Sequence, residues 1–119
     1  MIEQLKDLVN ANPALVRRGR WLDAVMLLGI GEANWWVTIR AGRIEAIERE
    51  DWAVSRFDFA LRGTEDGWTQ FWADPPPPRH HDISALVREG KMRLEGDIDM
   101  LQANFLYLKL VLEQLRGRL

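Results

Sequence analysis

The chain has 119 residues, of which 47% are hydrophobic and 29% are charged, and its formal net charge is −2. This length predicts one domain over residues 1–119, and the composition is typical of a globular protein rather than a disordered one. With 16 basic residues against 18 acidic ones, we expect no binding to nucleic acid through bulk charge.

Cysteine is absent, which excludes disulfides, thiolate catalysis and metal sites built on cysteine. Residues 1–8 lack the basic start and unbroken apolar core of a signal peptide. No apolar run approaches the roughly 20 residues that span a bilayer, so we expect a cytoplasmic protein without a transmembrane segment. Six tryptophans beside four phenylalanines are a large aromatic load for so small a core.

The first elements are predicted from their apolar spacing. Residues 2–9 have the period of a short amphipathic helix, which Asn12-Pro13 should end or interrupt. Arg17, Arg18 and Arg20 follow. They could meet a phosphate or an anionic lipid head, or they could simply form a solvated helix end or turn.

Four strands are expected next. The first is apolar on both faces, as in a strand that is covered on both sides, and Gly42 closes a tight hairpin between the second and third. Trp35 and Trp36 are neighbours in the second strand, so their side chains should point to opposite faces. The short connections predict an antiparallel meander. The expected ranges are 22–30, 33–41, 43–49 and 55–62.

The second half predicts two short helices, a fifth strand and a long helix. Thr64 should cap the first helix, which carries Trp68, Phe71 and Trp72 on one face and ends at the prolines 75–78. The remaining elements are a helix from Asp82 to Gly90, a strand over 91–95 and a helix over about 98–115.

The last predicted helix is apolar around most of its circumference. Two neighbouring stripes contribute, one through Leu101 and Leu108 and the other through Met100 and Tyr107. One sheet face cannot cover both stripes. The remainder should meet another helix, a second subunit or a bound apolar molecule.

A resemblance to a known family rests on the segment 86–97. Its sequence, Leu-Val-Arg-Glu-Gly-Lys-Met-Arg-Leu-Glu-Gly-Asp, resembles the helix, Gly-Lys, alternating strand, Gly-Asp, helix segment of the sterol carrier protein-2 (SCP2) family. Residues 56–61 and the helix with Trp68 resemble the stretch upstream of it, and the similarity covers roughly residues 21–115. The chain departs from the family in its short N-terminal helix, its proline connector and its longer final helix.

The resemblance implies an α+β fold with a five-stranded, largely antiparallel sheet, covered by helices and ending in a long C-terminal helix. It also implies a non-enzymatic domain without a cofactor or catalytic set. In the family, a cleft between sheet and helices holds a sterol, fatty acid, acyl-CoA or isoprenoid. The expected lining residues are Trp35, Trp68, Phe71, Trp72, Met100, Leu101, Asn104, Phe105, Leu108 and Leu112.

Each of these residues also has a structural interpretation. The aromatic residues on one helix face could be ordinary helix-on-sheet core, and the last helix could combine core with a dimer surface. Asn104 could hold the polar head of a ligand or be a satisfied structural amide.

Two polar groups are candidates for catalytic or metal sites. His80 and His81, beside Asp82, could bind a metal or supply a base, but they fit a solvated loop before a helix cap better, and we expect no metal site. Glu95 and Asp97 could form a carboxylate pair, although a cap role for Asp97 at a helix start is favoured.

The sequence therefore predicts a non-catalytic carrier of a hydrophobic ligand. One alternative is an accessory subunit that presents such a ligand to a partner enzyme, with the last helix as docking or homodimer surface. A further alternative is a small isomerase or hydrolase of the cone-shaped fold, with His81 or Asp58 as base.

Overall fold

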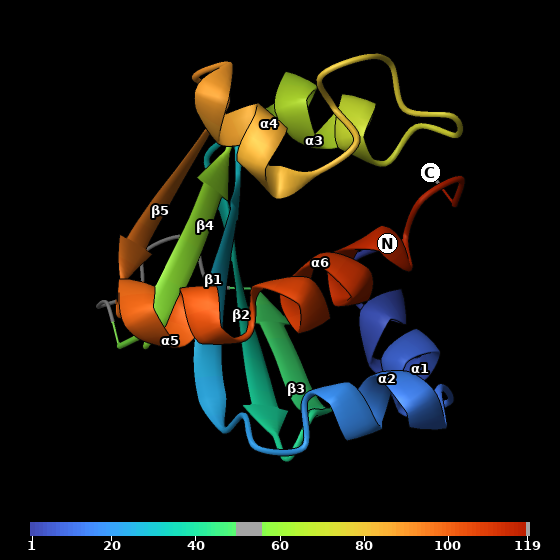
Figure 1. The fold of residues 1–119 in the computed structure, drawn as a ribbon, viewed down its shortest axis with the longest axis vertical. Coiled ribbons are helices and arrows are strands. Elements are labelled where there is room, and N and C mark those ends of the chain that lie inside the picture. Colours follow the sequence, from blue (N-terminus) through green and yellow to red (C-terminus); the bar gives the residue numbers. More distant parts are fainter. Residues whose placement is uncertain (50–55, 119) are drawn as a thin grey trace.

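A five-stranded sheet forms the centre of the computed structural model, which describes residues 1–49 and 56–118. The strand order is β3-β2-β1-β4-β5, and the helices lie at one face and at the ends of the sheet (Figure 1). Within the described residues no helix is long and apolar enough to cross a membrane. The strands are β1 Ala24–Ile30, β2 Ala33–Arg40, β3 Arg43–Arg49, β4 Phe59–Gly63 and β5 Met92–Gly96.

The predicted meander is correct for β1 to β3 and wrong for β4. β4 pairs in parallel with β1, with Met26 opposite Phe59 and Leu28 opposite Leu61, while the other three pairings are antiparallel. Phe59 and Leu61 are completely buried, so this short apolar strand lies inside the sheet rather than at its edge. A parallel neighbour needs a crossover connection, and residues 50–55, where the predicted fourth strand begins, lie outside the described residues.

Side-chain caps begin most of the helices. The carboxylates of Asp82 and Asp97 and the hydroxyl of Thr64 each accept a hydrogen bond from the backbone N–H three residues ahead, as predicted. Asn12 does the same for Leu15, so it starts a second helix instead of only ending the first. The helices are α1 Gln4–Asn10, α2 Pro13–Arg18, α3 Glu65–Phe71, α4 Ile83–Arg88, α5 Ile98–Ala103 and α6 Phe105–Glu113.

The single helix predicted over residues 98–115 is broken at Asn104. This residue has non-helical angles, φ −115° and ψ 18°, and its amide Nδ2 donates to the Met100 carbonyl at 2.9 Å. An asparagine side chain that bonds the backbone competes with the helical pattern. Leu101 and Leu108 are buried on either side of the break, so both segments face the core (Figure 1).

The aromatic residues of α3, together with Trp72 at its C-cap, are buried in the core. Trp68 stacks on Trp72 with ring centroids 4.7 Å apart and meets Phe71 edge-on. The indole Nε1 of Trp68 donates to the Gly29 carbonyl, and that of Trp72 donates to the Leu112 carbonyl, each at 2.8 Å. These bonds join α3 to β1 and to α6, so the sheet and two helices share one aromatic centre.

Tyr107 links α6 to the turn between β2 and β3. It is 3% exposed, its hydroxyl donates to the Gly42 carbonyl at 2.6 Å, and burial raises its pKa to about 12. The unfolded tyrosine ionises near pH 10. The folded chain therefore keeps this proton between about pH 10 and 12 while the unfolded chain releases it.

The pH dependence of unfolding tests this burial. We expect the Tyr107 contribution to be complete below pH 10 and to fall by about 1.4 kcal/mol per pH unit up to about pH 12. Urea unfolding of the parent chain and of Tyr107→Phe, measured across this range, gives the difference in their free energies of unfolding. The contributions of the other titrating groups are the same in both chains and cancel in this difference. The phenylalanine variant should start less stable and the gap should narrow; parallel curves would contradict the assignment.

Candidate functional site

An apolar pocket of about 360 Å³ opens between α4, β5, α5 and α6. We call it the α4–β5–α6 pocket. Its volume lies within the range of roughly 300–1,000 Å³ of small-molecule sites. Its lining residues are Ser84, Val87, Leu94, Gln102 and Phe105.

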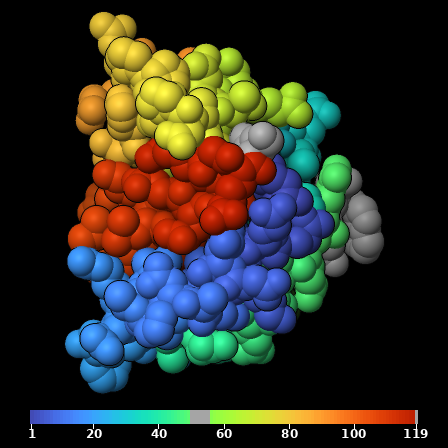
Figure 2. All heavy atoms as spheres, turned by 90° about the vertical axis from the view of Figure 1, so that its right-hand side faces the viewer, coloured from blue at the N-terminus to red at the C-terminus, as the bar shows by residue number. Residues whose placement is uncertain are grey.

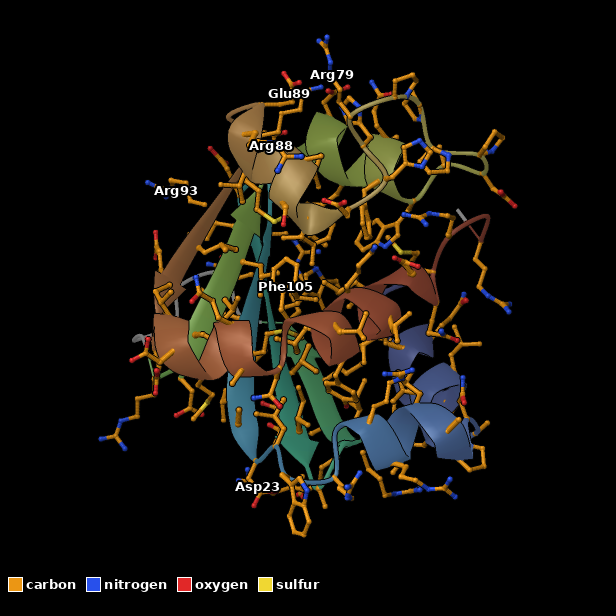
Figure 3. All side chains as sticks on the ribbon, in the orientation of Figure 1. Asp23, Arg79, Arg88, Glu89, Arg93 and Phe105 are labelled. Carbon is orange, nitrogen blue, oxygen red and sulfur yellow. The ribbon has the colours of Figure 1, made fainter. Side chains whose placement is uncertain are left out.

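Three apolar side chains from separate elements meet at this pocket. Val87 lies in the last turn of α4 and is 38% exposed, Leu94 lies on β5 opposite Leu61 of β4, and Phe105 is the first residue of α6. In Figure 3, Phe105 lies in front of the sheet, between α4 and the α5–α6 pair. Leu94 and Phe105 are half-buried, so the fold leaves apolar surface open to water at this place.

The pocket also holds two uncharged polar groups. Ser84 comes from α4 and Gln102 from α5. Neither side chain hydrogen-bonds to another residue in the described ranges 1–49 and 56–118. A hydroxyl and an amide both donate and accept, so they can bind the polar end of an otherwise apolar molecule.

The residues expected to line a cleft are divided between pocket and core. Phe105 lines the α4–β5–α6 pocket, and Met100 is half-buried against the core. Asn104 bonds the Met100 carbonyl, while Trp35 lies half-buried on β2 beneath the Arg49 guanidinium. The others are buried core residues, and their contact with a ligand stays a prediction: Trp68, Phe71, Trp72, Leu101, Leu108 and Leu112.

A second hollow of about 320 Å³ is more polar. Four glycines line it together with Arg62, Lys91 and Arg93. Arg62 and Arg93 both pair with Glu95, at 2.8 and 3.5 Å. Lys91 pairs with Asp66 at 2.9 Å, and this hydrogen bond lowers the pKa of the Asp66 carboxyl. These cations already have carboxylate partners, so the hollow is a weaker candidate.

A third hollow of about 400 Å³ lies where the end of α3 meets the C-terminal residues. Its lining includes Trp72, whose indole N–H is already bonded to Leu112, and the charged Asp74. Among these three hollows, the α4–β5–α6 pocket is therefore the one whose walls best suit an apolar molecule.

His80 and His81 lie in the loop before α4, and their contacts are with the backbone, with Lys91 and with Arg116. His81 is exposed, and its carbonyl accepts from Arg116. The ring of His80 lies 2.8 Å from the Lys91 ammonium through Nε2 and 2.9 Å from the Pro78 carbonyl through Nδ1. Within residues 1–49 and 56–118 no group of three or more potential ligands could hold a metal ion.

The other candidate carboxylates accept hydrogen bonds from the backbone or form ion pairs. Asp97 caps α5, as expected, whereas Glu95 pairs with Arg62 and Arg93. Asp58 accepts from the Val25 N–H at 2.7 Å and so joins the start of β4 to β1. These contacts give each group a structural role.

No protein-family model matches the chain, and no curated protein matches it. Solved structures do match it. A crystal structure of sterol carrier protein 2 aligns with TM-score 0.76 and 15% identity over 95% of this chain and 91% of that one. A conserved hypothetical protein from Thermus thermophilus, described as possibly a sterol carrier protein, aligns with TM-score 0.74 and 12% identity over 98% and 83%.

A third match is the UbiJ-SCP2 ubiquinone synthesis protein, with TM-score 0.60 and 21% identity over 94% of this chain and 85% of that one. The alignments cover nearly the whole chain and agree with the mixed, mostly antiparallel sheet. The resemblance of residues 86–97 to the sterol carrier protein-2 family predicted this similarity of fold. The chain therefore has the α+β fold of sterol carrier protein 2.

Proposed function

We propose that this chain binds a lipid or another small apolar molecule in the α4–β5–α6 pocket and acts as a carrier without catalysis. The observation that carries the proposal is the meeting of Val87, Leu94 and Phe105 around an open hollow of about 360 Å³. The fold supports it, since solved chains of the same fold include a sterol carrier protein and a ubiquinone synthesis protein.

Apolar burial supplies the affinity in this proposal. Each Å² of apolar surface removed from water contributes about 25 cal/mol, so a chain or ring system gains affinity without precise polar contacts. Ser84 and Gln102 would take the polar end of the ligand. Carriage needs no base or nucleophile, in agreement with the structural roles of Asp58, Glu95 and Asp97.

An accessory subunit is the second candidate. Leu106 is 53% exposed and directly follows Phe105, so a partner enzyme could contact apolar surface next to the pocket. A homodimer through α6 would use the same residue. Both arrangements, like a cytoplasmic location, stay predictions.

Filling the pocket tests the proposal. We expect Val87→Trp to weaken binding at least about tenfold, because losing the burial of two methylenes already removes about 1.6 kcal/mol. Native mass spectrometry with fatty acids, acyl-CoAs, sterols and isoprenoid quinones would measure the binding. Leu106→Trp is the matched control, since Leu106 is exposed but outside the lining. The proposal fails if the parent chain binds none of the four classes, or if the two variants bind equally.

A further inference from the structure

Five arginines surround one end of the molecule, away from the α4–β5–α6 pocket. Residues 17–23 run from the last turn of α2 to the start of β1, and residues 40–43 form the turn between β2 and β3; together we call them the basal surface. Two hydrogen bonds join the segments: the Ala41 N–H donates to the carboxylate Oδ1 of Asp23 at 2.7 Å, and the Gly42 N–H donates to the Leu22 carbonyl at 3.4 Å. The arginines are Arg17, Arg18, Arg20, Arg40 and Arg43, all exposed.

The two segments lie side by side in space. In Figure 2 the blue atoms that follow α2 and the green atoms of the β2–β3 turn are adjacent along the lower edge. Asp23, labelled at the lower end of Figure 3, marks the same place, whereas Arg88 and Phe105 lie higher on the molecule. The basal surface is therefore one end of the fold.

The basal surface is positive on a protein that is negative as a whole. Its eleven residues hold five arginines and Asp23, which gives +4, and the whole chain has −2, so the other residues sum to −6. Glu45, which lies 4.0 Å from Arg40, lowers the local value to +3. Such an asymmetry orients the protein toward an anionic partner.

An exposed tryptophan stands among these arginines. Trp21 is 84% exposed, and the Arg20 guanidinium lies 5.3 Å from its ring centroid. The other tryptophans that the structure describes are half-buried or buried. An indole that is apolar over its faces and polar at its N–H suits the boundary between lipid headgroups and acyl chains.

We propose that the basal surface docks on an anionic phospholipid bilayer, with the arginines at the headgroup phosphates and Trp21 inserted at headgroup depth. This inference goes beyond the proposed function and stands on different residues. A planar bilayer fits an end of the fold with one exposed indole, whereas proteins that bind single-stranded nucleic acid align aromatic rings along a groove for base stacking. The arginine–tryptophan combination is also typical of peripheral membrane anchors.

Vesicle co-sedimentation measures the docking. We expect the full chain to bind phosphatidylcholine vesicles that contain phosphatidylglycerol, to release them at high salt, and to leave pure phosphatidylcholine vesicles unbound. One arginine near an anionic surface contributes about fivefold in affinity. Reversal of two, in Arg17→Glu with Arg43→Glu, should therefore weaken binding by at least about 25-fold.

Two matched variants control for charge and for apolar exposure. Arg79→Glu with Arg88→Glu changes the net charge equally at another end of the molecule (Figure 3) and should keep vesicle binding. Trp21→Ala should weaken binding several-fold, while Leu106→Ala should leave it unchanged. Ligand binding in native mass spectrometry should stay intact in the basal variants, which separates this proposal from the pocket.

The proposal is overturned if the basal and control reversals bind vesicles equally. It is also overturned if neutral vesicles bind as well as anionic ones. Binding of a DNA duplex or single strand in preference to anionic vesicles would assign the arginines to a nucleic acid instead. Circular dichroism of each variant, with unchanged thermal unfolding, shows that these exposed substitutions leave the fold intact.

Discussion

Replacing Trp68 by alanine is expected to remove about 3–5 kcal/mol from the free energy of unfolding. Trp68 is 1% exposed, stacks on Trp72 and donates to the Gly29 carbonyl. Removing the indole leaves a cavity and ends the stacking on Trp72. It also leaves the buried Gly29 carbonyl of β1 without its hydrogen-bond donor. Domains of this size have about 5–15 kcal/mol in total, so this variant should be close to unfolding at moderate temperature.

Urea unfolding followed by circular dichroism measures this effect, and two variants divide it into its causes. Trp68→Phe keeps much of the volume but lacks the indole N–H, so it should lose about 1–3 kcal/mol. Trp21→Ala removes the same side chain from an exposed position and should change stability by less than about 0.5 kcal/mol. A Trp68→Ala chain within about 1 kcal/mol of the parent would contradict a core role.

Local signals predict the parts of the fold that depend on local contacts. Thr64, Asp82 and Asp97 are identifiable as caps because a cap bonds a backbone N–H only three residues away. Gly42 is identifiable as a hairpin turn, and it has the positive φ of 79° that such turns require. The resemblance of residues 86–97 extends these signals to the whole fold.

The predictions that were wrong concern the neighbour with which β4 pairs and the continuity of the last helix. The alternation of Phe59 and Leu61 predicts a strand, but a period of two contains no information about which neighbour the strand takes or in which direction. Asn104 is a polar residue within the predicted helix, but the apolar stripe through Leu101, Phe105 and Leu108 continues across it and predicts an unbroken helix. The cause of the break is one side-chain bond to the Met100 carbonyl, which the apolar spacing does not reveal.

The sequence predicts only part of the lining of the candidate pocket, because local spacing does not show which elements pack together. Trp68, Phe71 and Trp72 have the spacing of one helix face, and this pattern is the same for a core and for a ligand wall. Their depth in the core comes from the packing of α3 between β1 and α6. Ser84 and Gln102 are ordinary polar helix residues, and only the approach of α4 to α5 and α6 brings them to one pocket.

Gly42→Ala is the second change from which we expect a large effect. Gly42 has φ +79°, and a Cβ there would overlap the Val16 carbonyl oxygen and lie 2.7 Å from the Gly19 carbonyl carbon. Both are backbone atoms, which cannot rotate away. Strain of about 1–3 kcal/mol from the positive φ adds to about 1–3 kcal/mol from overpacking, so we expect a loss of about 2–6 kcal/mol.

Gly90→Ala provides a matched control for Gly42→Ala. Gly90 has nearly the same φ, +74°, but a Cβ there meets nothing within 4 Å, so only the conformational cost of about 1–3 kcal/mol should remain. The difference in urea unfolding between the two variants therefore measures the contact between the β2–β3 turn and the end of α2. That contact holds the two halves of the basal surface together, and Tyr107 reinforces it through the Gly42 carbonyl. Equal losses in both variants would mean that the turn does not press on α2, and the basal surface would then lack the rigid frame that its arginines require.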